Sequence, residues 1–355
     1  MQDELLRYSC QLALPGFNEE TQRQLQNAKV LIAGAGGLGC PAGQYLAAAG
    51  IGTIGIADYD NISISNLHRQ ILYTPADAGL KKVTVACDKL QRQNPGISII
   101  PHNTKITSEN VMELITQYDL VMDCTDNFET KYLLNDACVL QRKPLIYGAI
   151  YQYEGQVAVW NLLSKDGTYS PNYRDLFQNV NASQVPNCAD GGVMPTLAGI
   201  IGCMQANEVI KYFAKQGDLL AGKILLFDVQ TMQSRVIKVG TITKTNITAL
   251  TETIERPVIP PKDFKELADT GAYELIDVRS AEEHNSFNIG GKNIPVNEIE
   301  KKFSLIDLEK SVVMYCATGK RSGEAVSLFK NKFPGAKAFS LEGGLEALDQ
   351  KEIKE

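Results

Sequence analysis

A glycine-rich turn between an apolar run and a helix-forming segment constrains the fold of this chain most strongly. The run KVLIAG covers residues 29–34, and the turn before QYLAAAG has the spacing G-x-G-x-x-G, with Gly34, Gly36 and Gly39. Glycine at such a turn lets the backbone approach a phosphate, and the helix N-terminus supplies N–H donors. TIGIADYD is typical of a second strand, and Asp58 stands at its end. The segment therefore predicts a βαβ unit that binds a nucleotide, and Asp58 is placed to bind the ribose hydroxyls.

Further apolar runs extend this unit into one sheet. DLVMDCTDN and KPLIYGAI have strand length and are separated by helical stretches, which predicts parallel strands. EGQVAVWN, GKILLFDV and SRVIKVG favour antiparallel pairing, so the sheet should be mixed. Residues 191–216 carry apolar residues at helical spacing and predict a long buried helix.

The length of 355 residues suits two domains. The stretch 241–261 is rich in threonine and ends in prolines, which is typical of an extended connector. We therefore expect a first domain over 1–245, a linker over 246–261, and a second domain over 262–355. The predicted fold class is α/β: a Rossmann-like domain with a mixed β-sheet, followed by a smaller α/β domain.

Charge and composition exclude several classes of protein. Lysine and arginine number 35 against 41 acidic residues, a net charge of −6, so we expect no nucleic-acid partner and no membrane surface. No apolar run reaches the roughly 18 residues of a membrane span, and the N-terminus lacks a signal-peptide pattern, which favours a cytoplasmic location. The eight cysteines form no C-x-x-C pair and the three histidines are far apart, so no structural zinc is expected.

The residues beyond Asp58 favour ATP over NAD. Hydride transfer needs no cations over the phosphates, whereas AMP transfer needs them to neutralise the α-phosphate and the leaving pyrophosphate. A carboxylate after the strand in CTDN is placed to hold Mg²⁺ beside those phosphates. An NAD-dependent oxidoreductase is the alternative. The candidate residues of the ATP site are Asn66, Arg69, Gln70, Lys82 and Asp126.

Five sequence blocks, in order over about residues 4–240, resemble the MoeB/ThiF family, the bacterial relatives of ubiquitin-activating enzymes: RYSCQL, GAGGLGCPAGQYLAAAG, DYDNISISNLHRQ, CTDN and NCADGGVMPTLAGIIG. The resemblance implies that ATP adenylates the C-terminal glycine of a ubiquitin-like sulfur carrier protein of the MoaD/ThiS type, and that the chain forms a homodimer. It implies catalytic roles for Arg69 and Asp126. The nucleotide site that it implies comprises Gly37, Asp58, Asn66, Arg69, Lys82, Asp126 and Asn127.

The sequence departs from the family pattern in two places, which affects the expected zinc binding and the expected catalytic activity. Zinc-binding members carry C-x-x-C pairs where this chain reads TYSPNYRDLF and VGTITKTNITAL, which is a second reason to expect no zinc. Cys10 stands where most members have an arginine that reaches the phosphates of the partner subunit. A carrier-binding scaffold with weak or no catalysis is therefore a further alternative.

Cys188 lies in SQVPNCADGG, just before the predicted long helix, where a helix N-terminus favours a thiolate. A buried structural cysteine is the competing interpretation. The family resemblance implies that this cysteine attacks the activated carrier or resolves a persulfide-linked intermediate.

Cys316 lies in the loop CATGKRS between a predicted strand and a predicted helix, where backbone N–H groups can surround the sulfur and Arg321 adds positive charge. With DVRS at 277–280, the loop resembles the rhodanese family over residues 262–355; a tyrosine phosphatase loop would place its arginine one position later. We expect His284 to be a plain surface residue. The predicted persulfide loop comprises Cys316, Ala317, Thr318, Gly319, Lys320 and Arg321.

The sequence thus predicts an adenylyltransferase fused to a sulfurtransferase, with ATP and Mg²⁺ as cofactors. A persulfide on Cys316, supplied by a cysteine desulfurase or a small-molecule sulfur donor, would attack the acyl-adenylate. The carrier would serve molybdenum cofactor or thiamine biosynthesis, or another thiolation route.

Overall fold

The computed structural model describes residues 5–178, 191–250 and 257–348. The chain divides into two compact units, Met1–Thr253 and Ile254–Glu355. The division falls inside the stretch that the sequence predicts as a linker. None of the described helices is long and apolar enough to cross a membrane.

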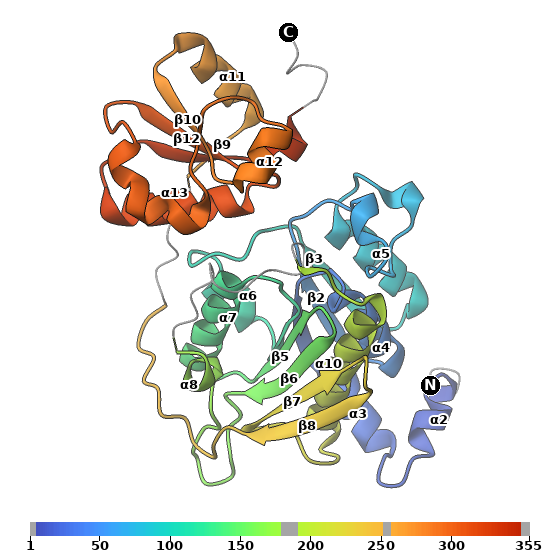
Figure 1. The fold of residues 1–355 in the computed structure, drawn as a ribbon. Coiled ribbons are helices and arrows are strands. Elements are labelled where there is room, and N and C mark those ends of the chain that lie inside the picture. Colours follow the sequence, from blue (N-terminus) through green and yellow to red (C-terminus); the bar gives the residue numbers. More distant parts are fainter. Residues whose placement is uncertain (1–4, 179–190, 251–256, 349–355) are drawn as a thin grey trace. The chain divides into compact units, whose positions relative to one another are not determined.

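The first unit is built on one mixed sheet, as predicted (Figure 1). Its strand order in the described residues is β3-β2-β1-β4-β5-β6-β7-β8. The strands from β3 to β5 pair in parallel, and those from β5 to β8 pair antiparallel. The bounds are β1 Lys29–Ala33, β2 Thr53–Ala57, β3 Ser98–His102, β4 Leu120–Asp123, β5 Leu145–Tyr151, β6 Glu154–Trp160, β7 Lys223–Asp228 and β8 Gln233–Lys238.

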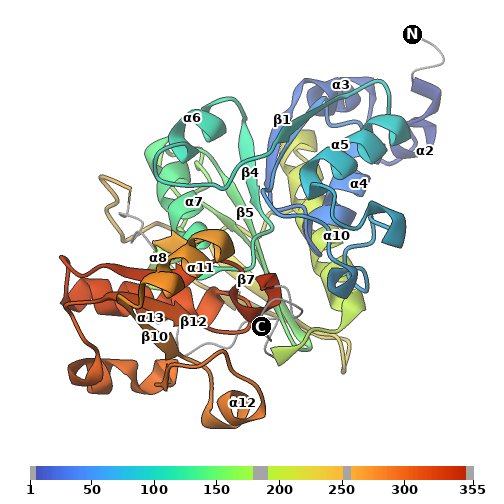
Figure 2. The same ribbon diagram turned by 90° about the horizontal axis from the view of Figure 1, so that it is seen from above.

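Helices cover both faces of this sheet (Figure 2). Val30 and Ile32 of β1 pack with residues of α3, α4, α5 and α10, whereas Leu31 and Ala33 pack with α6 and α7. This alternation explains why β1 reads as a continuous apolar run, since both of its faces are buried. The helical bounds are α2 Ser9–Leu12, α3 Glu19–Asn27, α4 Gly39–Ala49, α5 Lys82–Gln93, α6 Val111–Thr116, α7 Phe128–Leu140, α8 Tyr173–Leu176 and α10 Pro195–Ala214, with short 3-10 turns η1 Ile64–Asn66 and η2 Pro75–Asp77.

The glycine turn lies at the carboxyl edge of the sheet, where β1 stands between β2 and β4. Gly34 has φ +100°, and a Cβ there would lie 2.8 Å from the carbonyl oxygen of Cys124. A Cβ on Gly39 would lie 2.0 Å from the carbonyl oxygen of Gly34. Side chains are therefore excluded at both positions. The turn opens at the crossover point of the sheet, where α/β proteins bind ligands.

The second unit is a smaller parallel sheet with strand order β11-β10-β12-β13-β9. Its first strand, β9 at Val258–Ile259, comes from the end of the stretch that the sequence predicts as linker. The strand and the helix that the sequence predicts on either side of the Cys316 loop are confirmed as β12 and α13. The remaining bounds are β10 Tyr273–Asp277, β11 Lys292–Asn293, β12 Ser311–Tyr315, β13 Ala338–Leu341, α11 Pro261–Thr270, α12 Ala281–Ser286, α13 Lys320–Lys332, η4 Val296–Leu305 and η5 Gly344–Ala347.

Candidate nucleotide and sulfur sites

Hydrogen bonds join the glycine turn to Asp58 and Lys82. The backbone N–H of Ala35 donates to Asp58 Oδ2 at 2.8 Å, and the N–H of Asp60 donates to Asp58 Oδ1 at 2.8 Å. Lys82 Nζ donates to Asp60 Oδ2 at 2.8 Å. The hydroxyl of the buried Tyr73 donates to the carbonyl oxygens of Ala35, at 2.8 Å, and Lys82, at 3.3 Å. The ring of contacts is therefore closed, and it fixes the predicted ribose carboxylate relative to the predicted phosphate cation.

Burial also affects the acid groups at this edge. Burial raises the pKa of Asp58, although the charge of Lys82 and the two backbone N–H donors oppose the shift. Partial burial, together with the charges of Asp60 and Asp126, raises the pKa of Tyr59 to about 12. The negative charges of several carboxylates therefore act on Tyr59 at this edge of the sheet. A polyphosphate entering such a site needs cations.

Arg69 lies beside the turn, because a Cβ on Gly37 would lie 3.5 Å from Arg69 Cγ. Its guanidinium donates to Asn66 Oδ1 at 3.0 Å and lies 3.2 Å from the ring nitrogen Nε2 of His68. Neither of these partners is a carboxylate, and no acidic side chain of the described residues pairs with Arg69. The positive charge of Arg69 is therefore not balanced by them and can serve an anion.

Gln70 supports a ligand at the turn. The side chain is buried, at 4% exposed, and its Oε1 has no hydrogen-bond partner among the described residues. Its Nε2 would lie 3.5 Å from a Cβ on Gly36, so the amide reaches the glycine turn. An unpaired buried acceptor costs about 1–3 kcal/mol, and a hydroxyl or amine of a nucleotide would satisfy it. The donors and acceptors of the site thus fit a nucleotide.

The CTDN segment has two different roles in the structure. Asp126 is exposed beyond the end of β4, whereas Asn127 begins α7 and its side chain accepts the N–H of Thr130 at 2.8 Å. The buried Asp123, which the sequence reasoning missed, pairs with Lys131 at 3.0 Å and accepts the N–H of Thr125 at 3.0 Å. This pair holds the start of the loop that carries Asp126. An exposed carboxylate suits Mg²⁺, which keeps several waters and binds one or two carboxylates plus phosphate oxygens.

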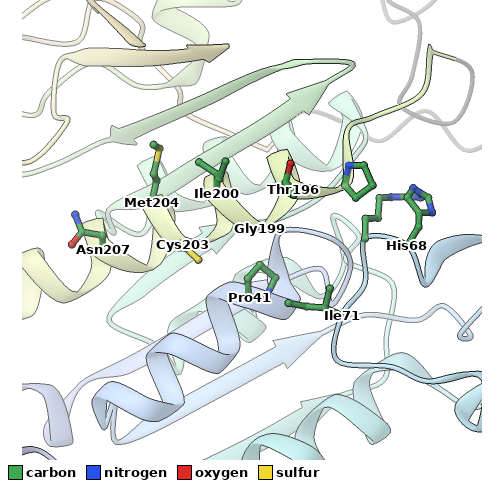
Figure 3. Close-up of a pocket in the computed structure, with 11 residues that line it drawn as sticks. Pro41, His68, Ile71, Thr196, Gly199, Ile200, Cys203, Met204 and Asn207 are labelled. Atoms are coloured by element: carbon green, nitrogen blue, oxygen red, sulfur yellow. The ribbon is translucent and has the colours of Figure 1, made fainter. Parts of the chain in front are cut away.

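Cys188 lies outside the described residues. The described chain resumes before α10, and an open apolar groove of about 850 Å³ runs along this helix (Figure 3). Gly199, Ile200, Cys203 and Met204 line it from α10. The facing side comes from the start of α4 and from the loop that includes Arg69, with Pro41, His68, Arg69 and Ile71.

The sulfur of Cys316 is buried at the end of β12. The N–H of Gly319 donates to Sγ at 3.1 Å, and Ser322 Oγ lies 3.6 Å from it. Gly319 has φ +84° and precedes α13, so the sulfur sits at the N-terminal end of a 13-residue helix. The Gly319 N–H and the N-terminal end of the helix thus both direct partial positive charge at the sulfur.

Arg321 contacts a carboxylate that the sequence reasoning missed. Its two terminal nitrogens donate to the two carboxylate oxygens of Glu283, each at 2.7 Å. Ser280 fixes Glu283 in turn, because the N–H of Ser280 donates to Glu283 Oε2 at 3.0 Å. Hydrogen bonds from Arg321 lower the pKa of Glu283 to about 2. Glu283 therefore balances much of the positive charge of Arg321, which the sequence analysis expected to act on the Cys316 sulfur.

The expectation for His284 was wrong. Its Nδ1 lies 2.9 Å from Oδ2 of the fully buried Asp277, and its side chain is only 19% exposed. Arg279 also donates to Asp277, at 2.6 Å. Although burial raises the pKa of Asp277, the hydrogen bonds from Arg279 and His284 outweigh that effect and hold it below its usual value. His284 thus ties α12 to the end of β10.

Comparison with protein families assigns both units. The model described as "ThiF family" matches residues 8–248. The chain belongs to the ThiF family. The model described as "Rhodanese-like domain" matches residues 260–351, so a rhodanese-like domain follows the ThiF domain.

Curated relatives are similar in sequence to this chain over nearly its whole length. "Probable adenylyltransferase/sulfurtransferase MoeZ" of Mycobacterium tuberculosis is 38% identical, over 97% of this chain and 93% of that protein. "Adenylyltransferase and sulfurtransferase MOCS3" of Culex quinquefasciatus is 37% identical, over 99% of this chain and 89% of that protein.

Solved structures support the ThiF fold. MccB of E. coli with succinimide has a TM-score of 0.60 at 22% identity, covering 68% of this chain and 74% of that chain. MccB with ATP has a TM-score of 0.58 at 23% identity, covering 66% and 72%. At these identities the likeness concerns the fold alone.

Hydrogen bonds join TYSPNYRDLF to VGTITKTNITAL, the two segments in which the sequence analysis found no C-x-x-C pair. Asn172 Nδ2 donates to Thr243 Oγ1 at 2.8 Å and to Thr245 Oγ1 at 2.6 Å. Asp175 accepts from Thr243 Oγ1 at 2.7 Å and from the N–H groups of Lys244 and Thr245 at 2.7 and 3.0 Å. Within the described part of the chain, no cluster of three or more His, Cys, Asp or Glu side chains is arranged to hold a metal.

Proposed function

We propose that this chain uses ATP to adenylate the C-terminal glycine of a ubiquitin-like sulfur carrier and then replaces AMP by sulfur from Cys316. One observation carries the proposal: a single chain combines a ThiF nucleotide site, with cations at its glycine turn, and a rhodanese-type cysteine cradle. Relatives over nearly the full length are named for both activities. An NAD-dependent oxidoreductase has no use for the second site.

The first reaction makes a poor electrophile reactive. A carboxylate cannot expel oxide, whereas an acyl-adenylate expels AMP. The carrier carboxylate attacks the α-phosphate, and pyrophosphate leaves. Lys82 and Arg69 bind the phosphates and stabilise the charge that develops there, and Asp58 orients the ribose. Mg²⁺, which Asp126 would hold, supplies further charge neutralisation when it is bound.

The second reaction uses the persulfide of Cys316. Its terminal sulfur attacks the acyl carbon, a C–S bond forms, and the C–O bond to AMP breaks, so the carrier is joined to Cys316 through an acyl disulfide. A thiolate then attacks the Cys316 sulfur and releases the carrier thiocarboxylate. We assign this thiolate to Cys188. The disulfide left between Cys188 and Cys316 needs a thiol reductant before the next cycle.

The sulfur donor, pathway and location complete the proposal. A cysteine desulfurase or a small sulfane donor loads Cys316, because either delivers a terminal sulfur to a thiolate. The carrier serves molybdopterin synthesis, thiamine synthesis or another thiolation route, and the protein works in the cytoplasm.

We further propose that the groove on α10 is the homodimer surface. Its lining is mostly apolar, and Ile71 at its rim is 60% exposed. Homodimer interfaces are more apolar than the rest of a protein surface, so a mostly apolar groove suits one. Arg69 links the groove to the nucleotide site, so pairing here would bring a second copy close to the nucleotide.

Analytical ultracentrifugation tests this surface. Ile71→Glu should shift the sedimentation of the protein from dimer to monomer. A monomeric unaltered protein would remove this assignment.

Carrier-dependent exchange of labelled pyrophosphate into ATP tests the adenylation step. With candidate ubiquitin-like carriers ending in Gly-Gly, exchange should appear with one of them and vanish when its terminal glycine is removed. A scaffold would bind carrier and ATP without exchange. That result would refute the enzymatic assignment despite the family membership.

A further inference from the structure

We infer that Asp60 is a positioning residue of the nucleotide site, which holds the ammonium of Lys82 where the phosphates bind. The inference rests on the proposed use of ATP at this site. Asp60 contacts Lys82 twice: its carbonyl oxygen accepts the N–H of Lys82 at 3.0 Å, and its Oδ2 accepts from Nζ at 2.8 Å.

The burial of Lys82 explains why its ammonium needs a partner. Its side chain is 6% exposed, whereas that of Asp60 is 50% exposed. Asp60 is the carboxylate that hydrogen-bonds this ammonium, and the charge of Asp58 also acts on it. A buried ammonium that loses its hydrogen-bonded counter-charge is strongly unfavourable, so the side chain would leave the site. A lysine stem also has four flexible bonds, and a fixed partner removes much of the entropy cost of ordering it for a ligand.

The backbone of Asp60 is fixed independently of this ion pair. Its N–H donates to Asp58 at 2.8 Å, and the next residues pair with the segment that leads into α5. In that pairing the N–H of Ile62 donates to Leu80 at 2.8 Å, and the N–H of Gly79 donates to Ile62 at 2.9 Å. Substitution of the Asp60 side chain therefore removes the carboxylate and leaves the path of the chain in place.

Asp60 could either hold Lys82 in place for a phosphate or compete with the phosphate for Lys82, and the number of donors on the ammonium decides between the two. An ammonium has three N–H donors, and Asp60 takes one of them. Lys82 can therefore keep Asp60 while it donates to a phosphate oxygen, and the two anions need not displace each other. Loss of Asp60 should then weaken phosphate binding; a competitor carboxylate would have the opposite effect.

Calorimetric binding of Mg–ATP and of adenosine to the full chain tests this inference. Asp60→Ala should weaken Mg–ATP binding roughly tenfold and leave adenosine unchanged, because Lys82 contacts phosphates alone. Asp60→Asn, which keeps an oxygen acceptor, should lose less. In a Lys82→Ala background, Asp60→Ala should have no further effect, since the carboxylate acts through that lysine.

Asp88→Ala is the matched control, because it removes an exposed ion pair with Arg92, at 2.7 Å, on the same helix. It should bind Mg–ATP as the unaltered protein does. Unchanged or tighter Mg–ATP binding in Asp60→Ala would overturn the inference, as would an equal loss in the Lys82→Ala background. These outcomes leave the proposed function intact; failure of the unaltered chain to bind Mg–ATP would remove both.

Discussion

Glu283 and Arg321 form a two-point ion pair at the end of the loop that begins at Cys316, with both N···O distances at 2.7 Å. They lie 38 residues apart in the sequence, on α12 and at the start of α13. The pair ties the cysteine loop to a neighbouring helix. It therefore serves the shape of the sulfur cradle as well as its charge.

This pair should stabilise the second unit in a pH-dependent way. The folded protein lowers the pKa of Glu283 from 4.5 to about 2, so the stabilisation is fully present above pH 4.5 and is lost as the pH falls toward 2. The difference in unfolding free energy between the unaltered chain and Glu283→Gln should be constant from about pH 8 to 5 and shrink below that. Denaturant titrations measure it. A difference that does not depend on pH would contradict this account.

Cys316→Ala should abolish thiosulfate:cyanide sulfurtransferase activity and leave carrier-dependent pyrophosphate exchange unchanged. The reason is that we propose the persulfide to form on this sulfur, whereas we assign adenylation to the first unit. Cys203→Ala, at a half-buried cysteine of α10, is the control and should retain sulfur transfer. Sulfur transfer that survives in Cys316→Ala would exclude this cysteine as the carrier of sulfur.

Adjacent residues after β4 should behave differently on substitution. Asp126→Ala should abolish pyrophosphate exchange with little change in stability, because the side chain is exposed and is proposed to hold Mg²⁺. Asn127→Ala should lower the unfolding free energy by about 1 kcal/mol, because it removes the helix cap on Thr130. Asn127→Asp keeps the cap and is the control. Unchanged exchange in Asp126→Ala would remove it from the site.

Gln70→Leu should weaken nucleotide binding without loss of stability. Its Oε1 is buried and unpaired among the described residues, so an apolar side chain removes a desolvation cost and also the ligand's acceptor. Thermal unfolding with and without Mg–ATP measures both effects. Equal nucleotide-induced stabilisation in the two proteins would show that Gln70 does not contact the ligand.

Chelation should not destabilise the first unit, since hydrogen bonds, and no C-x-x-C pairs, join TYSPNYRDLF to VGTITKTNITAL. Asp175→Ala should cost about 1 kcal/mol or more, because it removes the acceptor of hydrogen bonds from the partly buried Thr243 Oγ1 and Thr245 N–H and from the exposed N–H of Lys244. Asp166→Ala, an exposed aspartate that bonds within its own turn, is the control. A large fall in melting temperature on addition of EDTA would reveal a structural metal.

The sequence predicted the elements whose signals are local. The glycine turn, the change from parallel to antiparallel strands and the long buried helix all follow from periodicity and turn residues. The long helix was placed over 191–216, and the structure begins α10 at Pro195. This proline marks a helix start, a signal that the sequence already carried.

The partners of the site residues could not be predicted in the same way. Asp60 and Lys82 are 22 positions apart, and Glu283 and Arg321 are 38 apart. No periodicity connects such residues, because the pairing depends on how the sheet brings separate loops together. The signal for Asp60 was its place two residues after Asp58, at the carboxyl edge of a predicted strand. His284 was misjudged for the same reason, since its partner Asp277 lies on a strand that it meets only in the fold.

Mass spectrometry of a candidate carrier, after incubation with this chain, Mg–ATP, thiosulfate and a thiol reductant, tests the central claim most directly. Replacement of one oxygen by sulfur should raise the carrier mass by about 16 Da, and the shift should be absent without ATP and with Cys316→Ala. A carrier that gains this mass with Cys316→Ala, or one that is adenylated and never gains it with the unaltered chain, would contradict the account.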